Sequence, residues 1–317
     1  MSKKKFKISI LEVLIGISFI GVGIAFLAFS KNLSKKEQPK EYVQFTKKID
    51  PVCDSIVGSM KYSVEAGIAL DISTGEIFWE YNSEKPCEIA SLTKIMVELL
   101  AMEKLEARQV SLRDTVTVTP DASCIGGSQV YLKAGERFVL EDLLRAAIIY
   151  SANDAAYLAG SYIGGSKENF IKMMNDKSTE LGLHHTKFWN MTGLPPAKGY
   201  ENEVNMSDCI DIATISMQAL KYPYVKTWMS TKLSSFRNGK FTMRTRNTLM
   251  RHCDLVDGLK TGYYPKAGWN IVATSLCGER KIMVVLLGSK SRRARDSIAK
   301  NLILYAKDKP SGLVASK

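Results

Sequence analysis

Strand-like sequence stands at both ends of the body of this 317-residue chain, and helical sequence fills the middle. Residues 67–72 and 76–81 are two β-prone runs, and the Ser73-Thr-Gly75 turn between them is typical of a hairpin. Near the other end, residues 269–274 and 281–287 are again apolar and strand-like. We therefore expect an α/β (α+β) fold in which the two ends share one sheet, with a helical insert beside it.

The middle of the chain carries helical patterns. Residues 91–108 repeat apolar side chains at helical spacing, and a second helix is predicted over 140–150, directly before Ser151. Residues 116–136 between them are β-prone and contain glycine. Further helices are predicted over 167–182, 205–220 and 293–307.

The N-terminus predicts the compartment. A positive segment over residues 3–7 precedes an apolar stretch over 8–29 that only Glu12 interrupts. A bilayer span needs about 20 apolar residues, whereas the core of a cleavable signal has about 7–15. We therefore expect residues 1–31 to be a retained membrane anchor with its lysines on the cytoplasmic side. The alternative is a signal peptide cleaved after Ser30, and in both cases the body is exported.

The segment behind this stretch is predicted to be a linker. Residues 32–61 are polar and lysine-rich and contain Pro39 and Pro51. The folded body then covers residues 62–308, and residues 309–317 form a short C-terminal tail.

Composition narrows the partners. Lys and Arg total 44 against 32 Asp and Glu, a formal net charge of +12. No nucleic-acid module is recognisable, and much of the basic excess lies near the N-terminus, which favours the membrane or cell envelope over nucleic acid as a partner. The six cysteines form no Cys-x-x-Cys pair, so disulfides and buried free thiols are equally compatible with the sequence. The three histidines lack metal-ligand spacing, and we expect no metal and no cofactor.

Three short segments stand in a fixed order: Ser91-Leu-Thr-Lys94, Ser151-Ala-Asn153 and Lys260-Thr-Gly262. Each segment alone is weak evidence of a function. Ser2 with Lys5 also fits Ser-x-x-Lys, which shows that this pattern arises by chance. Taken singly, they are explained equally well as a helix N-cap, a capping turn and an exposed edge strand. Together they match the set used by acyl-transfer enzymes that attack with a serine and no histidine.

The first segment predicts a nucleophile and its base. Ser91 opens a predicted helix, so Lys94 lies one turn on and on the same face. A serine hydroxyl needs a base to accept its proton, and a lysine can do so only when neutral. The pKa of Lys94 must then be lowered by burial or by a nearby cation, for which Lys260 is the candidate.

The second segment predicts a proton relay. Ser151 lies in a turn between two predicted helices, where its hydroxyl can pass a proton between Lys94 and the leaving amine. The Asn153 amide can hold a substrate backbone.

The third segment predicts recognition of an anionic group. Lys260 and Thr261 begin a strand and present charge and a hydroxyl, and Gly262 lets a ligand lie close to the backbone. We expect the backbone N–H groups of Ser91 and Tyr263 to form an oxyanion hole.

At these residues the chain resembles the low-molecular-mass penicillin-binding proteins, the D-alanyl-D-alanine carboxypeptidase family of serine peptidases. The likeness runs from about residue 62 to residue 307, and its further segments are 70–76, 126–136, 151–156, 181–186, 192–194 and 258–262. It implies a β-lactamase/DD-peptidase-like fold, with an antiparallel sheet flanked by helices and a helical subdomain. Residues 62–308 would then be a DD-peptidase catalytic domain.

The resemblance also implies roles. Ser91 would be the acylated nucleophile, Lys94 its base and Ser151 the relay. The residues implied to contact substrate are Asn153, Lys260, Thr261, Gly262 and Tyr263. Arg295 aligns with a family arginine near the substrate carboxylate, with Arg292 and Arg293 as neighbouring alternatives.

The implied reaction removes the terminal D-alanine of a peptidoglycan pentapeptide through a serine acyl-enzyme, with β-lactams as covalent inhibitors. It would take place on the extracytoplasmic side of the bacterial cytoplasmic membrane. Many relatives add a β-rich domain and a C-terminal amphipathic anchor, whereas ten residues follow Lys307 here, so the N-terminal segment is the expected tether. Ala152 stands where glycine is frequent in the family, a change expected to affect the turn and not the chemistry.

Several alternatives stay open on the sequence. A β-lactamase needs a glutamate-activated water, and no Glu-x-x-Leu-Asn segment lies between Ser151 and Lys260, where Glu168 and Glu180 fall in ordinary helices. A catalytically silent scaffold is disfavoured because all the chemical residues are present. A DD-endopeptidase or a transpeptidase would use the same residues.

Overall fold

The computed structural model describes residues 44–309. The expected anchor over 1–31 and nearly all of the tail lie outside these residues. Within the described part, no helix has both the length and the apolar character that a membrane span requires.

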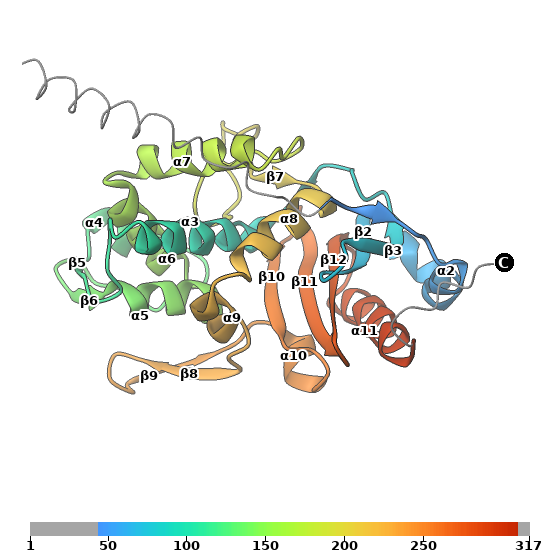
Figure 1. The fold of residues 1–317 in the computed structure, drawn as a ribbon. Helices are drawn as coiled ribbons and strands as arrows, with labels where there is room; N and C mark the ends of the chain where they lie inside the picture. Colours follow the sequence, from blue (N-terminus) through green and yellow to red (C-terminus); the bar gives the residue numbers. More distant parts are fainter. Residues whose placement is uncertain (1–43, 310–317) are drawn as a thin grey trace, which may run out of the picture. The chain divides into compact units, whose positions relative to one another are not determined.

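The two ends of the body share one six-stranded sheet, in the order β1-β3-β2-β12-β11-β10 (Figure 1). Its strands are β1 (Thr46–Lys47), β2 (Ala66–Asp71), β3 (Glu76–Tyr81), β10 (Gly258–Tyr264), β11 (Gly268–Cys277) and β12 (Arg280–Ser289). The two-residue β1 runs parallel to β3, and the other pairs are antiparallel. The N-terminal and C-terminal strands of the sheet meet where β12 pairs with β2, for example Val285 with Ile68. The predicted antiparallel sheet is thus confirmed.

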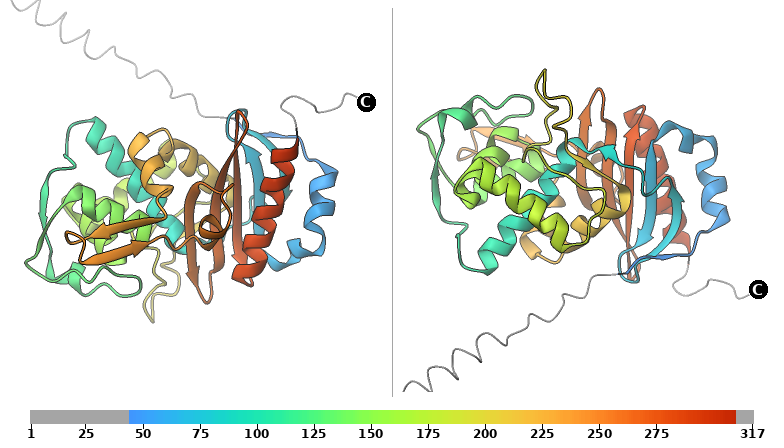
Figure 2. Two further views of the ribbon diagram at one scale, coloured as in Figure 1. Left: turned by 90° about the horizontal axis from the view of Figure 1, so that it is seen from below. Right: turned by 90° about the horizontal axis from the view of Figure 1, so that it is seen from above.

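Helices cover both faces of this sheet, which explains why residues 282–287 of β12 are all buried. The predicted C-terminal helix forms as α11 (Arg292–Asp308) and packs on β11 and β12 beside α2 (Pro51–Val57). Its Ile298 and Leu302 join Trp79 of β3 in the core. Figure 2 shows α11 and α2 on one side of the sheet and the helical part on the other.

The helical part surrounds α3 (Lys94–Glu106), whose first nine residues are buried. The helices around α3 are α5 (Leu140–Arg145), which continues into the π-helical turn η3 (Ala146–Tyr150), α6 (Asn153–Gly164), α7 (Lys167–Glu180) and α8 (Cys209–Ala219). The predicted helices in this region are confirmed, with α8 beginning four residues later than expected.

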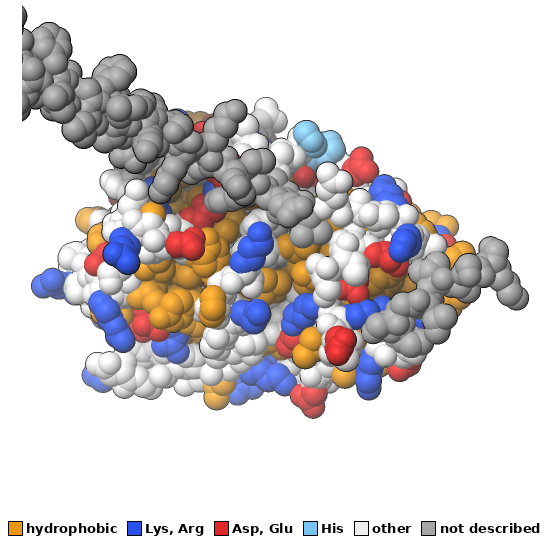
Figure 3. Space-filling view, viewed as in Figure 1, with side chains coloured by type: hydrophobic (Ala, Val, Ile, Leu, Met, Phe, Trp, Pro, Cys, Tyr) orange, Lys and Arg blue, Asp and Glu red, His pale blue; other side chains and the backbone are white. Residues whose placement is uncertain are grey.

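Short elements complete the described chain. They are η1 (Gly58–Ser63), β4 (Cys87–Glu88), η2 (Ala90–Thr93), β5 (Thr115–Thr117), α4 (Pro120–Ser123), β6 (Arg137–Val139), β7 (Met206–Ser207), α9 (Pro223–Met229), β8 (Leu233–Phe236), β9 (Phe241–Arg244) and α10 (Thr248–His252). Figure 3 shows hydrophobic side chains gathered over the helical part on one face, with Lys and Arg side chains distributed around them.

The structure differs from the expected linker over residues 32–61, because β1, α2 and most of η1 form inside it. The Asp50 side chain caps α2 by accepting from the Val52 N–H at 3.0 Å. Pro51, which suggested a linker, stands at the first helical position, where proline is well tolerated. Cys53 is fully buried in the core. All six cysteines are free thiols, so the structure forms none of the disulfides that the sequence left open.

Candidate active site

Ser91 and Lys94 lie together where the 3-10 turn η2 runs into α3. Lys94 Nζ is 3.2 Å from Ser91 Oγ, 2.7 Å from Asn153 Oδ1 and 2.5 Å from the Thr192 carbonyl oxygen. The Lys94 side chain has 0% exposure. The amine therefore has a fixed position beside the hydroxyl, with no access to bulk water.

Burial shifts the protonation of this lysine. It lowers the pKa of Lys94 well below its ordinary value, and the charge of Lys260 lowers it further, while Asp154 opposes the shift. Asp154 is itself held by backbone N–H groups of Val130 and Leu132. A neutral Lys94 amine is the form that can accept the proton of Ser91.

Ser151 is paired with the second lysine. Lys260 Nζ lies 2.9 Å from Ser151 Oγ and 2.8 Å from the Thr261 carbonyl oxygen. Burial, followed by the charge of Arg246, lowers the pKa of Lys260 to about 7. The sequence expected Ser151 to exchange its proton with Lys94, whereas the hydrogen bond in the structure is to Lys260. Ser151 ends η3 with φ 67°, a left-handed conformation that is uncommon outside glycine and often found at functional sites.

Asn153 is occupied within the protein. Its Oδ1 accepts from Lys94 Nζ at 2.7 Å and its Nδ2 donates to the Gly126 carbonyl at 2.8 Å. The sequence expected this amide to hold a substrate backbone. In the structure it braces Lys94, and a substrate contact stays a prediction.

A loop over residues 189–194 supplies a third partner of Lys94 that the sequence reasoning missed. Asn190 Oδ1 accepts from the backbone N–H groups of Thr192 at 3.1 Å and Gly193 at 2.7 Å. These bonds close a tight turn of the kind that asparagine favours, and the turn directs the Thr192 carbonyl at Lys94. In the sequence, the only signal at residues 192–194 is their resemblance to the family.

Asn205 ties this loop to η2, directly before α3. Its Nδ2 donates to Thr93 Oγ1 at 2.9 Å and to the Asn190 carbonyl at 2.8 Å. Its Oδ1 accepts from the Trp189 N–H at 2.7 Å. Asn205 is buried, so these bonds are shielded from water.

Two glycines allow the backbone to close around Ser91. A Cβ on Gly262 would lie 3.0 Å from Ser91 N and 2.7 Å from the Ile89 carbonyl oxygen. A Cβ on Gly193 would lie 2.0 Å from the Ala90 carbonyl oxygen. Strand β10 and the 189–194 loop thus pack closely against η2, the turn that carries Ser91 and is called the nucleophile turn below. Ala90 in this turn has φ 46°. The expected oxyanion donors, the N–H groups of Ser91 and Tyr263, lie on segments that contact one another here.

The reactive groups open into a cleft of about 370 Å³. Its lining residues are Ser91, Ser128, Tyr150, Ser151, Arg244, Thr245, Arg246, Thr248, Arg251, Thr261, Gly262, Tyr263, Trp269, Arg292 and Arg295. Lys94, Asn153 and Lys260 are buried beneath this lining. A larger hollow of about 730 Å³, which includes Met102 and Tyr222, contains none of the predicted site residues.

Two cleft residues have internal partners. Tyr263 is 49% exposed and stacks on Trp269 with ring centroids 3.9 Å apart. Arg295 is almost fully buried, and its guanidinium donates to Asp296 at 2.6 Å and to Thr248 Oγ1 at 3.3 Å. Of the three arginines considered on α11, Arg292 and Arg295 line the cleft and Arg293 does not.

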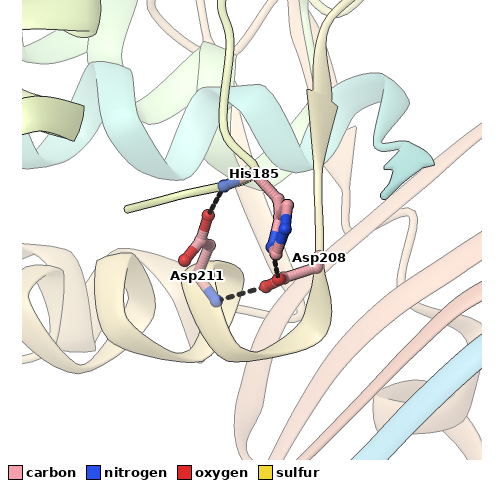
Figure 4. A group of neighbouring side chains, drawn as sticks. All are labelled: His185, Asp208 and Asp211. Atoms are coloured by element: carbon pink, nitrogen blue, oxygen red, sulfur yellow. Dashed lines mark hydrogen bonds and ion pairs between the residues drawn. The ribbon is translucent and has the colours of Figure 1, made fainter. Parts of the chain in front are cut away.

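One group of side chains with metal-binding chemistry, which the histidine spacing did not suggest, lies elsewhere in the described chain (Figure 4). His185 Nδ1 lies 2.6 Å from Asp208 Oδ2, and Asp208 Oδ1 caps α8 by accepting from the Asp211 N–H at 2.7 Å. Asp211 Oδ2 accepts from the His185 N–H and from Thr186 Oγ1. These bonds are sufficient to explain the cluster as the anchor of the α8 N-terminus.

Comparisons with known proteins agree with this geometry. A family model for D-alanyl-D-alanine carboxypeptidases matches residues 55–291. The chain is 29% identical to the D-alanyl-D-alanine carboxypeptidase DacF of Bacillus subtilis over 92% of its own length and 70% of that protein. It is 32% identical to DacC of Escherichia coli over 80% of its length and 63% of that protein. The chain thus spans roughly two thirds of these relatives.

Solved structures share the fold. Penicillin-binding protein 6B from Escherichia coli superposes with a TM-score of 0.70 at 31% identity, covering 76% of each chain. The ampicillin-bound form of penicillin-binding protein D2 from Listeria monocytogenes superposes with a TM-score of 0.69 at 25% identity, covering 78% of this chain and 98% of that one. The sheet and the helical part are therefore those of a DD-peptidase fold, and the chain belongs to the D-alanyl-D-alanine carboxypeptidase family of serine peptidases.

Proposed function

We propose that this chain is a serine-type DD-carboxypeptidase that removes the terminal D-alanine from peptidoglycan stem pentapeptides. The observation that carries the proposal is the fully buried Lys94 amine 3.2 Å from Ser91 Oγ. This contact supplies an activated nucleophile in a water-poor site, open to a cleft of peptide size.

Acylation begins at Ser91. Neutral Lys94 accepts the hydroxyl proton as Ser91 Oγ attacks the carbonyl carbon of the penultimate D-alanine. The N–H groups of Ser91 and Tyr263 stabilise the oxyanion. As the C–N bond breaks, Ser151 gives its proton to the leaving nitrogen and takes one from the Lys260 ammonium, 2.9 Å away. Free D-alanine and an ester on Ser91 result.

Deacylation restores the starting state. Water attacks the ester carbonyl, its hydroxyl adds to the acyl carbon, and its other proton returns to Lys260 through Ser151. The ester bond breaks as Lys94 gives its proton back to Ser91 Oγ. Every proton moved in acylation is thereby returned.

The terminal carboxylate of the substrate is proposed to bind at Lys260, Thr261 and Arg295. β-Lactams, which mimic the acyl donor, would acylate Ser91 and remain as a slowly hydrolysed ester. A DD-endopeptidase reaction on crosslinked peptide would use the same residues.

A β-lactamase is less well supported. No glutamate or aspartate lines the cleft in the described part of the chain, so a carboxylate-activated water has no source there. Glu168 and Glu180 lie at opposite ends of α7, outside the cleft lining.

The site of action is proposed to be the outer side of the bacterial cytoplasmic membrane, with residues 1–31 as the anchor. The basic, apolar N-terminal sequence supports this placement.

The full-length chain should release D-alanine from diacetyl-L-lysyl-D-alanyl-D-alanine and become stably labelled by fluorescent penicillin. Ser91→Ala should abolish both. Ser55→Ala, at an exposed serine on α2, is the matched control and should behave as the parent. Undiminished D-alanine release by Ser91→Ala would refute the proposal, and rapid loss of the label would indicate a β-lactamase.

A further inference from the structure

The cleft carries more positive charge than a single carboxylate can balance. Five arginines line it, and no acidic residue of the described chain does so; the arginines are Arg244, Arg246, Arg251, Arg292 and Arg295. Guanidinium groups present planar, paired donors that suit carboxylates.

Most of these charges are not neutralised within the protein. Arg295 has Asp296 as its partner. Arg246 lies over the Tyr150 ring at 4.3 Å, and Arg292 over the Trp269 ring at 5.9 Å, contacts that orient a cation without removing its charge. Within residues 44–309, none of the other four cleft arginines has an acidic partner.

Arg251 is the most informative of the four. Its Nε is buried and has no hydrogen-bond partner in the described structure. A buried hydrogen-bond donor on a charged group is costly to leave without a partner. The partly buried Arg251 side chain also lines the cleft, so its charge faces a ligand there without an internal ion pair.

Three of these arginines are connected through the contact between α10 and α11. Arg295, proposed above to bind the terminal carboxylate, donates to Thr248 on α10, and Arg251 lies on the same short helix. Arg292 stands one turn before Arg295 on α11. Arg251 and Arg292 thus lie on the elements that hold Arg295, the residue proposed to bind the terminal carboxylate of the leaving residue.

We propose that the part of the cleft around Arg251 and Arg292 is a second anion subsite, which selects leaving groups that carry a carboxylate beyond their own α-carboxylate. The inference rests on the proposed function and names a substrate class for it: acyl-D-alanyl peptides with an acidic leaving residue. Arg251 binds the second carboxylate together with Arg292.

The test compares two isosteric leaving residues on the full-length enzyme. Diacetyl-L-lysyl-D-alanyl-D-glutamate and its D-glutamine counterpart differ in one charge, and diacetyl-L-lysyl-D-alanyl-D-alanine is the reference substrate. We expect kcat/KM for the D-glutamate peptide to exceed that for the D-glutamine peptide by about tenfold, since 1.4 kcal/mol of selective binding corresponds to that factor. The ratio should fall as salt is raised, because part of the site is open to solvent.

Two matched variants locate the effect. Arg251→Gln should lower the ratio of kcat/KM for the D-glutamate peptide to that for the D-glutamine peptide by about fivefold or more, because it removes one charge-assisted contact. Arg293→Gln removes the same charge from an exposed position outside the cleft lining and should leave the ratio unchanged. Thermal unfolding of both variants reports whether they are folded.

Equal kcat/KM for the two peptides, or a ratio that Arg251→Gln leaves intact in a folded protein, would overturn the subsite. If the enzyme releases D-alanine from the reference peptide but shows no preference between the D-glutamate and D-glutamine peptides, this inference alone is rejected. No release from any of the three peptides by the parent enzyme would instead reject the proposed function, and the inference with it.

Discussion

Lys260 Nζ lies 2.9 Å from Ser151 Oγ, and both side chains are buried. The other lysine of the site, Lys94, has its Nζ 3.2 Å from Ser91 Oγ. Each lysine has its pKa lowered chiefly by burial, and the charge of Lys260 contributes to the shift at Lys94. The two pairs therefore form one electrostatically coupled site. In the proposed mechanism, neutral Lys94 accepts the proton of Ser91, and charged Lys260 supplies a different proton through Ser151.

The first prediction concerns pH. The pKa of Lys260 is about 7, and its charged form is the one proposed to act, so kcat/KM should fall as pH rises through about 7. Arg246 is the second cause of this low pKa, so Arg246→Gln should raise it and move the falling limb to higher pH. Profiles of kcat/KM against pH measure this, with Arg293→Gln as the charge control. A falling limb at the same pH in Arg246→Gln would contradict the assignment.

The second prediction concerns the close packing against the nucleophile turn. Gly193→Ala places a Cβ 2.0 Å from the Ala90 carbonyl oxygen, which forces the backbone beside Ser91 to move. We expect penicillin acylation to slow by about 10²-fold, the usual effect of misplacing a reacting group by about 1 Å. Gly165→Ala shares the positive φ but has open space around its Cβ, so it should lose some stability and keep its acylation rate. Equal acylation rates in the two variants would argue against this role of the packing.

The third prediction concerns Asn205. Asn205→Ala removes the bonds that join the 189–194 loop to Thr93, and with them the support of the carbonyl that Lys94 contacts. We expect kcat to fall by about tenfold to 10²-fold while KM changes little, because Asn205 positions a catalytic group and does not line the cleft. Steady-state kinetics on the D-alanine peptide separate the two constants. Asn169→Ala, at an exposed asparagine on α7, is the control.

The fourth prediction concerns stability. Glu98 on α3 is fully buried, both of its carboxyl oxygens lack a partner in the described chain, and burial raises its pKa well above the ordinary value. The folded protein therefore binds a proton that the unfolded chain gives up above about pH 4.5. The stability associated with this group is complete below that pH and is lost as pH rises toward the folded pKa.

Glu98→Met should consequently stabilise the protein at neutral pH, by about 1–3 kcal/mol, with the gain increasing as pH rises. Urea unfolding at several pH values measures this, and Glu168→Met at an exposed position on α7 should change little. A loss of stability in Glu98→Met at neutral pH would contradict this account of the buried carboxyl.

Much of the fold was predictable because its signals are local. The β2–β3 hairpin follows directly from two β-prone runs and the turn between them, and α3 and α11 follow from helical spacing. Pro51 was misleading because proline serves equally in a linker and at the first position of a helix, and only the burial of Cys53 distinguishes the two.

The site was predictable in part for the same reason. The Ser91–Lys94 contact follows from one helical turn, whereas the partners of Ser151 and Lys94 do not. The bond from Lys260 to Ser151 spans 109 positions and that from Lys94 to Thr192 spans 98. No periodicity in the sequence encodes such distant contacts, so the roles of Asn190 and Asn205 emerge only from the folded chain.

The acylation rate of Lys94→Met with benzylpenicillin tests most directly whether a buried neutral amine activates Ser91. Methionine is unbranched and uncharged like the neutral lysine side chain, so it can occupy the same volume without a base. We expect single-turnover acylation to fall by about 10²–10⁴-fold, the usual contribution of a general base, in a protein that unfolds cooperatively. Acylation of Ser91 at the parental rate in Lys94→Met would contradict the mechanism.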